Sequence, residues 1–265
     1  MLRDVTLGQY FPGNTIAHRL DPRTKIILLV LYIVALFTAV GWVSYGAVLA
    51  ATGICMILSK ISVKNIFSGL KPMVVIIVLT AVLNMFYTQG EPVLSFWKLC
   101  ITKEGIDRAV KMVLRIMLLI TGTFLLTYTT SPLSLTDGLE RLMNPLKKIK
   151  VPVHELTMMM SMALRFIPTL IKETDKIMSA QKSRGADFES GGLVKRAKSL
   201  IPILVPLFVS AFRRADELAI AMESRCYHGG EGRTRMKKLE MRPADWAALA
   251  VGAVFTAVII AIRNV

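Results

Sequence analysis

The chain has 265 residues, of which 54% are hydrophobic, and 33 Lys and Arg against 18 Asp and Glu give it a formal net charge of +15. Its mean hydropathy of +0.54 is well above that of a soluble chain, which predicts a membrane protein and excludes a globular enzyme with one solvated surface. Aromatic residues make up 8% and no basic run is interleaved with them, so the basic balance indicates a cytoplasmic membrane face and no nucleic-acid partner.

Runs without charged residues predict about five transmembrane helices, because a spanning helix needs about 20 mostly apolar residues. The first run covers residues 26–59, too long for one crossing at about 1.5 Å per residue. It is expected to fold back at Gly41 into two short spans, 26–40 and 44–58. Further spans are predicted at residues 72–90, 116–136 and 246–262. The polar start of the chain predicts no cleavable signal peptide.

The distribution of Lys and Arg around the spans predicts their orientation. Basic residues precede the first span and fill the 59–72 loop, whereas the 88–111 loop has mixed charge. We therefore expect the N-terminus and residues 131–243 to be cytoplasmic and the C-terminus to lie outside. The expected organisation is a lipid-embedded region of about four spans, a cytoplasmic or interfacial helical region and a last span, at residues 1–130, 131–243 and 244–265.

The region 131–243 holds 20 Lys and Arg against 12 Asp and Glu and is expected to form helices separated by prolines. Amphipathic helices are predicted at residues 134–146, 154–183 and 200–224, the first with Thr136 and Asp137 as its N-cap. The two long helices begin apolar and end charged, which favours an interfacial position, with a small soluble bundle as the alternative. The predicted fold class is all-α, a polytopic membrane protein with amphipathic cytoplasmic helices.

The two long helices end in related sequences. Residues 175–185 align without gaps on residues 216–226, at an offset of 41, with Asp, Ala, Ser and Arg identical. Each copy ends in a triplet of Ser, Arg and a small residue: Ser183, Arg184, Gly185 and Ser224, Arg225, Cys226. In the purely structural interpretation, the triplets cap two helix ends and their arginines are solvated. The functional one is two ends that dock into two copies of a partner, because the arginine fork engages a carboxylate or several carbonyls at once.

Cys226 stands opposite Gly185 in the repeat. We expect it to take the left-handed conformation that ends the helix, although a residue other than glycine is strained there by about 1 kcal/mol. In the alternative, the helix continues through Cys226 and stops at Gly229 and Gly230.

Four segments together resemble the transmembrane T component of energy-coupling factor transporters. They are His-Arg-Leu-Asp-Pro-Arg-Thr-Lys at 18–25, Leu-Arg-Phe-Ile-Pro-Thr-Leu at 164–170, Ser-Arg-Gly at 183–185, and Arg-Arg-Ala-Asp-Glu-Leu-Ala-Ile-Ala-Met-Glu-Ser-Arg at 213–225. The resemblance runs from Gly8 to the last span. It implies a scaffold in the plasma membrane of a prokaryote, within an ATP-driven importer of a vitamin or other micronutrient. The implied partners are two ABC-type ATPase subunits on the cytoplasmic side and a substrate-binding S component in the bilayer.

In that family an Ala-Arg-Gly-like triplet ends each of two coupling helices and docks in a groove of each ATPase, which assigns this role to the triplets at 183–185 and 224–226. Cys226 departs from the usual Gly. Methionines with flexible, polarisable side chains are expected at the S-component interface, with ordinary core or lipid contacts as the alternative: Met158, Met159, Met160, Met162 and Met178.

No catalytic, metal or cofactor site is predicted in this chain. It has no GxxxxGK[ST] motif, so ATP hydrolysis is expected in the partner subunits. His18, His154 and His228 lack further ligands at metal spacing. A membrane-embedded enzyme is a less favoured alternative, because the spans are almost free of ionisable residues. The permease subunit of a conventional ABC importer is another, but it would carry one coupling helix where this chain has two helix ends.

Overall fold

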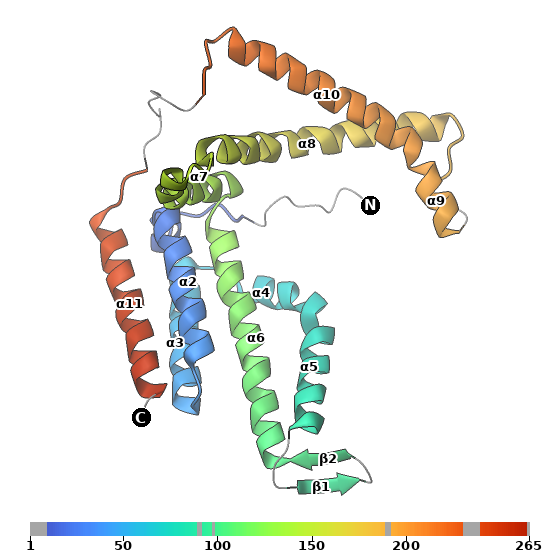
Figure 1. The fold of residues 1–265 in the computed structure, drawn as a ribbon. Helices are drawn as coiled ribbons and strands as arrows, with labels where there is room; N and C mark the ends of the chain where they lie inside the picture. Colours follow the sequence, from blue (N-terminus) through green and yellow to red (C-terminus); the bar gives the residue numbers. More distant parts are fainter. Residues whose placement is uncertain (1–9, 89–91, 97–98, 189–191, 230–238, 264–265) are drawn as a thin grey trace. The chain divides into compact units, whose positions relative to one another are not determined.

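The computed structural model describes residues 10–88, 92–96, 99–188, 192–229 and 239–263. The chain divides into two compact units (Figure 1). The first, here called the span unit, holds residues 8–139 and 239–265. The second, here called the hairpin unit, has all its described residues within 140–238.

The span unit is built from helices and one short strand pair. Its elements are α1 (Ile16–Arg19), α2 (Pro22–Thr38), α3 (Trp42–Ser59), α4 (Val63–Leu70), η1 (Lys71–Met73), α5 (Val74–Tyr87), β1 (Pro92–Phe96), β2 (Leu99–Thr102), α6 (Lys103–Thr129), most of α7 (Pro132–Met143), and α11 (Pro243–Arg263). Four helical stretches are long and apolar enough to cross a membrane: Trp42–Ser59, Val63–Tyr87, Lys103–Thr129 and Pro243–Arg263. The apolar α2, with 17 residues, is a shorter fifth. The predicted class, an all-α polytopic membrane protein with about five spans, is confirmed, with β1 and β2 as a small addition.

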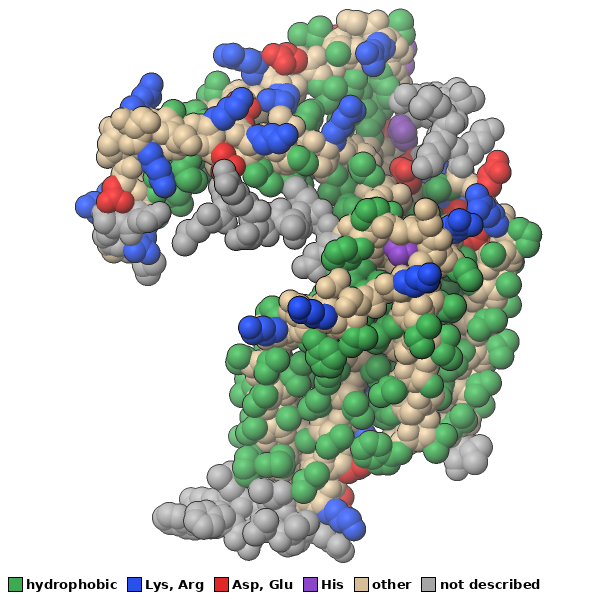
Figure 2. All heavy atoms as spheres, turned by 180° about the vertical axis from the view of Figure 1, so that it is seen from behind, with side chains coloured by type: hydrophobic (Ala, Val, Ile, Leu, Met, Phe, Trp, Pro, Cys, Tyr) green, Lys and Arg blue, Asp and Glu red, His purple; other side chains and the backbone are tan. Residues whose placement is uncertain are grey.

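Four helices of the span unit share one core. Its fully buried side chains come from α2, α3 and α11: Leu36, Val48 and Ile259, with Leu118 of α6 beside them. α11 approaches α2 closely at Gly252, where an added Cβ would meet the end of the Leu28 side chain and require it to shift. On the face that Figure 2 shows, hydrophobic side chains cover much of the spans, and many large hydrophobic residues of the spans are exposed. An apolar exterior around a tightly packed core is what a lipid environment requires.

The predicted fold-back of the first run is confirmed, because α2 ends at Thr38 and Gly41 is the N-cap of α3. The fourth span was predicted at 116–136, which is wrong at both ends, since α6 begins at Lys103 and ends at Thr129. It extends through charged residues because Thr102 caps its start, accepting from the Gly105 N–H at 3.1 Å, and because the Trp42 indole of α3 donates to Asp107 at 2.8 Å. It stops because Thr130 is extended (φ −135°, ψ 126°) and the next residue precedes a proline, which disfavours the helical conformation.

The first amphipathic helix also begins earlier than predicted. α7 begins at Pro132, and Ser131 caps it, because the Ser134 backbone N–H donates to Ser131 Oγ at 3.3 Å. Thr136 lies inside the helix, where its hydroxyl donates to the Pro132 carbonyl at 3.0 Å. The predicted N-cap at Thr136 and Asp137 is therefore wrong.

β1 and β2 form an antiparallel pair between α5 and α6, with Ser95 opposite Cys100. This pair was not predicted. Its strands have five and four residues, too few for a period of two to stand out in the sequence.

The hairpin unit contains η2 (Asn144–Ile149), α8 (Val153–Ser183), α9 (Leu193–Ser199) and α10 (Ile201–Glu223). The predicted helices at 154–183 and 200–224 are confirmed as α8 and α10, whereas the short α9 was not predicted. Pro168 lies inside α8 and Pro206 inside α10. These prolines each remove one backbone hydrogen bond without ending the helix, so they do not separate helices as expected.

Candidate functional site

The two helix ends that carry the Ser-Arg triplets have the same backbone geometry. In each, the N–H of the third triplet residue donates to the carbonyl three residues earlier, and the next N–H donates to the carbonyl five residues before it. These distances are 3.0 and 3.0 Å after α8, and 2.8 and 3.1 Å after α10. This pair of bonds is the Schellman motif, which satisfies the last helical carbonyls. The sequence repeat is therefore also a structural repeat.

The third triplet residue is left-handed at both ends, with φ of +84° at Gly185 and +55° at Cys226. The prediction that the second helix ends at Cys226 is confirmed, and the alternative in which it continues to Gly229 is wrong. A cysteine holds a conformation that costs a residue with a side chain about 1–2 kcal/mol. The second end thus keeps the shape of the first despite its different residue.

The triplet side chains also repeat. The Ser183 hydroxyl donates to the Ser179 carbonyl at 3.1 Å, and the Ser224 hydroxyl donates to the carbonyl four residues earlier at 2.8 Å. Arg184 and Arg225 are exposed, and neither guanidinium has a hydrogen-bond or ion-pair partner within the described part of the chain. Each arginine therefore presents five free N–H donors beside a helix end.

α8 and α10 run antiparallel (Figure 1). Near the end of α8, the Gln181 side chain donates to the Pro202 carbonyl near the start of α10, at 3.4 Å. Beyond the end of α10, the Tyr227 hydroxyl contacts the sulfur of Met158 near the start of α8, at 3.0 Å. The two arginine-bearing ends therefore lie at opposite ends of this helix pair.

An ion pair lies midway between those two contacts, where Arg214 Nη2 is 3.0 Å from Glu173 Oε2. These residues are 41 positions apart, the offset of the repeat, and stand two residues before its aligned segments. Residues at the repeat offset that meet between antiparallel helices lie where a local twofold axis would pass. Arg184 and Arg225 each lie eleven residues beyond that axis, in opposite directions. At 1.5 Å per residue this separates them by about 33 Å along the helices.

The predicted methionine surface is only partly exposed. Met159 and Met160 are 57% and 44% exposed, whereas the other three, Met158, Met162 and Met178, are half-buried. α10 adds a larger surface, here called the α10 apolar face, whose side chains are 45% to 69% exposed: Ile201, Leu204, Val205, Phe208, Val209 and Phe212. Their spacing of three and four residues was readable in the sequence, although no role was assigned to them.

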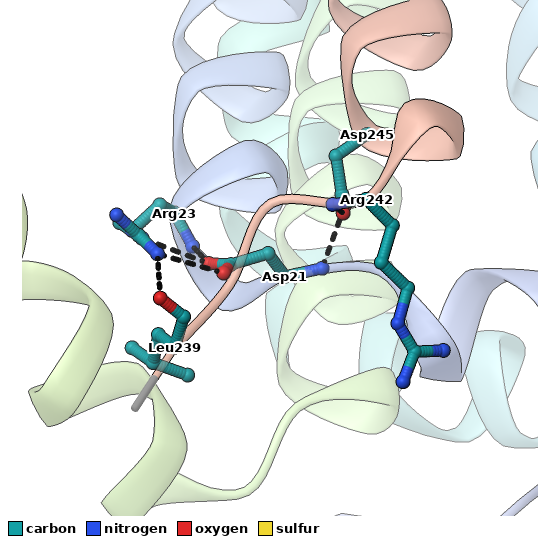
Figure 3. A network of polar contacts seen from close by, with 5 residues as sticks. All are labelled: Asp21, Arg23, Leu239, Arg242 and Asp245. Atoms are coloured by element: carbon teal, nitrogen blue, oxygen red, sulfur yellow. Dashed lines mark hydrogen bonds and ion pairs between the residues drawn. The ribbon is translucent and has the colours of Figure 1, made fainter. Parts of the chain in front are cut away.

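A second polar site lies in the span unit at the starts of α2 and α11 (Figure 3). The Arg23 guanidinium donates two hydrogen bonds of 3.1 Å to the Asp21 carboxylate. The Asp21 backbone N–H donates to Asp245 Oδ1, and the other Asp245 oxygen accepts from the Arg242 N–H, each at 2.8 Å. The segment 18–25 was recognised by resemblance, but its partner Asp245 was missed because 224 positions separate it from Asp21. Both carboxylates are buried and fully engaged.

Within the described ranges, no group of three or more His, Cys, Asp or Glu is placed to hold a metal ion. The fold and the two sites define a polytopic helical membrane subunit that presents two equally built, arginine-bearing helix ends.

Comparisons with known proteins specify this class further. Residues 13–236 match the CbiQ family, described as cobalt transport protein. The chain is 55% identical over 261 residues to the energy-coupling factor transporter transmembrane protein EcfT of Thermosediminibacter oceani, covering 96% of this chain and 98% of the relative. It is 53% identical over 255 residues to EcfT of Ruminiclostridium cellulolyticum, with 96% of each chain covered. For EcfT of Lactococcus lactis subsp. cremoris, identity is 48% over 245 residues and 92% of each chain.

The chain belongs to the CbiQ family and is the transmembrane T component of an energy-coupling factor transporter. It is a multi-pass membrane scaffold and not an enzyme, and the ATPase activity belongs to partner subunits. The resemblance identified from the sequence is thereby confirmed.

Proposed function

We propose that this chain couples two ABC-type ATPase subunits to a membrane-embedded S component, in an importer of a vitamin or other micronutrient. Ser183, Arg184 and Gly185 dock in one ATPase, and the equivalent triplet Ser224, Arg225 and Cys226 docks in the other. The observation that carries this proposal is the identical cap at the two helix ends, each with an exposed arginine that has no side-chain partner in the described ranges. Such an end fits a groove lined with carboxylates or carbonyls, because the guanidinium forms several charge-assisted hydrogen bonds at once.

The local twofold axis supports one ATPase on each end. A pair of related subunits has its own twofold axis, and equivalent surfaces related by such an axis bind equivalent ligands. When ATP binding closes the pair, each subunit carries one arginine-bearing end with it. α8 and α10, with 31 and 23 residues, then convey the movement along their length.

The S component is proposed to contact the five methionines together with the α10 apolar face. An exposed apolar surface of this size is costly in water and marks a contact with lipid or protein. Methionine side chains repack against more than one partner, which suits a surface against which an S component reorients during transport.

The N-terminus and residues 131–243 are proposed to be cytoplasmic and the C-terminus external. The start of α2 is hydrogen-bonded both to the start of α11 and to the end of α6, which supports a placement of all three on one side of the membrane, as this orientation requires. Single cysteines at 60–71 and 184–230 should react with an impermeant thiol reagent only from the cytoplasm, and those at 91–105 only from outside. Reaction at 184–230 from outside would reject the orientation.

The docking role is tested with Arg184→Ala, Arg225→Ala and the double variant, purified with their neighbours from the membrane. Truncating one side of a buried, charge-assisted contact costs about 2–5 kcal/mol, so each single change should weaken one ATPase contact about 30-fold or more. The two sites are about 33 Å apart, so their losses should add. Arg196→Ala is the matched control, because it alters an exposed arginine of α9 whose side chain has no partner among the described residues.

The double variant should insert normally but lose both ATPases and substrate uptake. If that variant keeps the wild-type subunit ratio and wild-type uptake, the two arginines only cap their helices in solvent and do not dock the ATPases. The composition of the wild-type complex tests the alternative class: two ATPases with a small membrane protein support the scaffold, whereas a second copy of this chain in their place supports a conventional permease.

A further inference from the structure

Among the described residues, the chain passes between its two units twice, once after residue 139 and once before residue 239. These two covalent connections carry a movement of α8 and α10 along the chain to the spans. In the span unit, the segment before the first connection and the segment after the second are both bound by residues 21–25, at the start of α2.

The first connection leaves the end of α6. The Lys25 ammonium donates to the Thr129 carbonyl at 3.0 Å, to Thr130 Oγ1 at 3.1 Å and to the His18 carbonyl at 3.4 Å. Its three N–H donors are thus all used. Thr129 is the last residue of α6, where unsatisfied carbonyls and the negative end of the helix dipole attract a cation.

The same connection is held again one helix further along. Gly138 of α7 packs against Pro22, so closely that a Cβ on Gly138 would lie 2.9 Å from the Pro22 Cβ. The part of α7 that belongs to the span unit, residues 132–139, is therefore held at both of its ends: by Lys25 just before it and by Pro22 at Gly138.

The second connection returns at Leu239. Arg23 Nη2 donates to the Leu239 carbonyl at 2.7 Å, while the same guanidinium is held by Asp21. Leu239 lies outside any helix, four residues before α11, so this bond caps no helix end. Its effect is to fix the place where the returning chain meets the span unit.

We propose that Arg23 and Lys25 are positioning residues that hold both connections against the start of one span, so that a displacement of the coupling helices reaches α2, α6 and α11 together. This inference rests on the proposed function, because the displacement comes from docked ATPases. Without Arg23, Leu239 is no longer bonded to the start of α2, so part of the movement shifts Leu239 and does not shift the spans. ATP is then still hydrolysed, but less of the movement reaches the spans.

The test uses the complete transporter complex, reconstituted in liposomes, with substrate uptake and ATP hydrolysis measured on the same preparation. Arg23→Gln removes the charge and the fork, Arg23→Lys keeps the charge, and Arg19→Gln changes an exposed arginine of the same segment that has no partner among the described residues. Arg23→Gln should assemble with the wild-type subunit ratio but lower uptake per ATP by about fivefold or more, the lower range of coupling between distant sites. Arg23→Lys should recover part of that ratio, and Arg19→Gln should match wild type.

An unchanged uptake per ATP in Arg23→Gln would overturn the proposal, as would a loss that only parallels a loss of assembled complex. Should Arg23→Gln fail to assemble, Thr130→Val decides, because it removes one acceptor of Lys25 and keeps the shape of the side chain. Uptake per ATP should then fall below wild type, and an unchanged ratio would overturn the proposal. A wild-type chain that binds no ATPase would instead refute the proposed function.

Discussion

Removing the Asp245 carboxylate should destabilise the span unit strongly. Its side chain accepts from two backbone N–H groups, of Asp21 and Arg242, and the residue is 1% exposed. Asp245→Ala leaves both donors buried without a partner, at about 1–3 kcal/mol each, or about 2–6 kcal/mol in total. Asp245→Asn keeps one acceptor oxygen and turns an amide N–H₂ toward the other donor, so its loss should be intermediate.

The apparent unfolding temperature in detergent measures this loss, with Trp246 beside the site as a local fluorescent probe. For a chain of this size each kcal/mol lowers that temperature by about 2–4 °C, so Asp245→Ala should lower it by at least about 4 °C. Glu240→Gln is the matched control, because Glu240 is exposed and has no partner among the described residues. If Asp245→Ala unfolds within about 1 °C of this control, water satisfies the two donors and the buried network does not hold the helix starts together.

Two glycine predictions follow from the backbone and packing geometry. Cys226→Gly relieves left-handed strain but adds entropy to the unfolded chain, so stability of the ATPase complex should stay equal or rise slightly, whereas Gly185→Cys should lower it by about 1 kcal/mol. A clear loss in Cys226→Gly would mean that the two ends dock differently. Gly138→Ala should lower the unfolding temperature of the span unit, because the added Cβ meets Pro22 at 2.9 Å. Gly53→Ala is the control and should be neutral or slightly stabilising, because nothing lies within 4 Å of its added Cβ. Equal effects of the two changes would contradict the close contact at Gly138.

Features that depend on local sequence were predictable. α8 begins within one residue of its predicted start, because a sustained period of 3.6 residues specifies a long amphipathic helix. The limits of α6 were not predictable from the sequence, because contacts from distant residues stabilise its charged first half. Arg115, for example, donates to the Ala39 carbonyl at 3.1 Å, and Asp107 accepts from the Trp42 indole at 2.8 Å.

The candidate site divides in the same way. The two triplets and the left-handed residue at Cys226 could be read from a gapless repeat. Their placement at opposite ends of an antiparallel pair required the contact between Glu173 and Arg214, which lie 41 positions apart. The buried network at Asp245 combines residues from both ends of the chain, and no local pattern connects them.

A residue on a twofold axis faces its own counterpart, so two identical copies would place like charges against each other there. The repeat avoids this because one copy has Glu173 and the other has Arg214 at the shared position. The backbone keeps the symmetry that the proposed docking of two ATPases requires, while the charges at the axis differ. The same difference acts against self-association: α8 packed in this register on α8 of a second molecule would bring glutamate onto glutamate, and two α10 helices would bring arginine onto arginine. The charge difference thereby disfavours the pairing of either helix with its own copy in a neighbouring molecule.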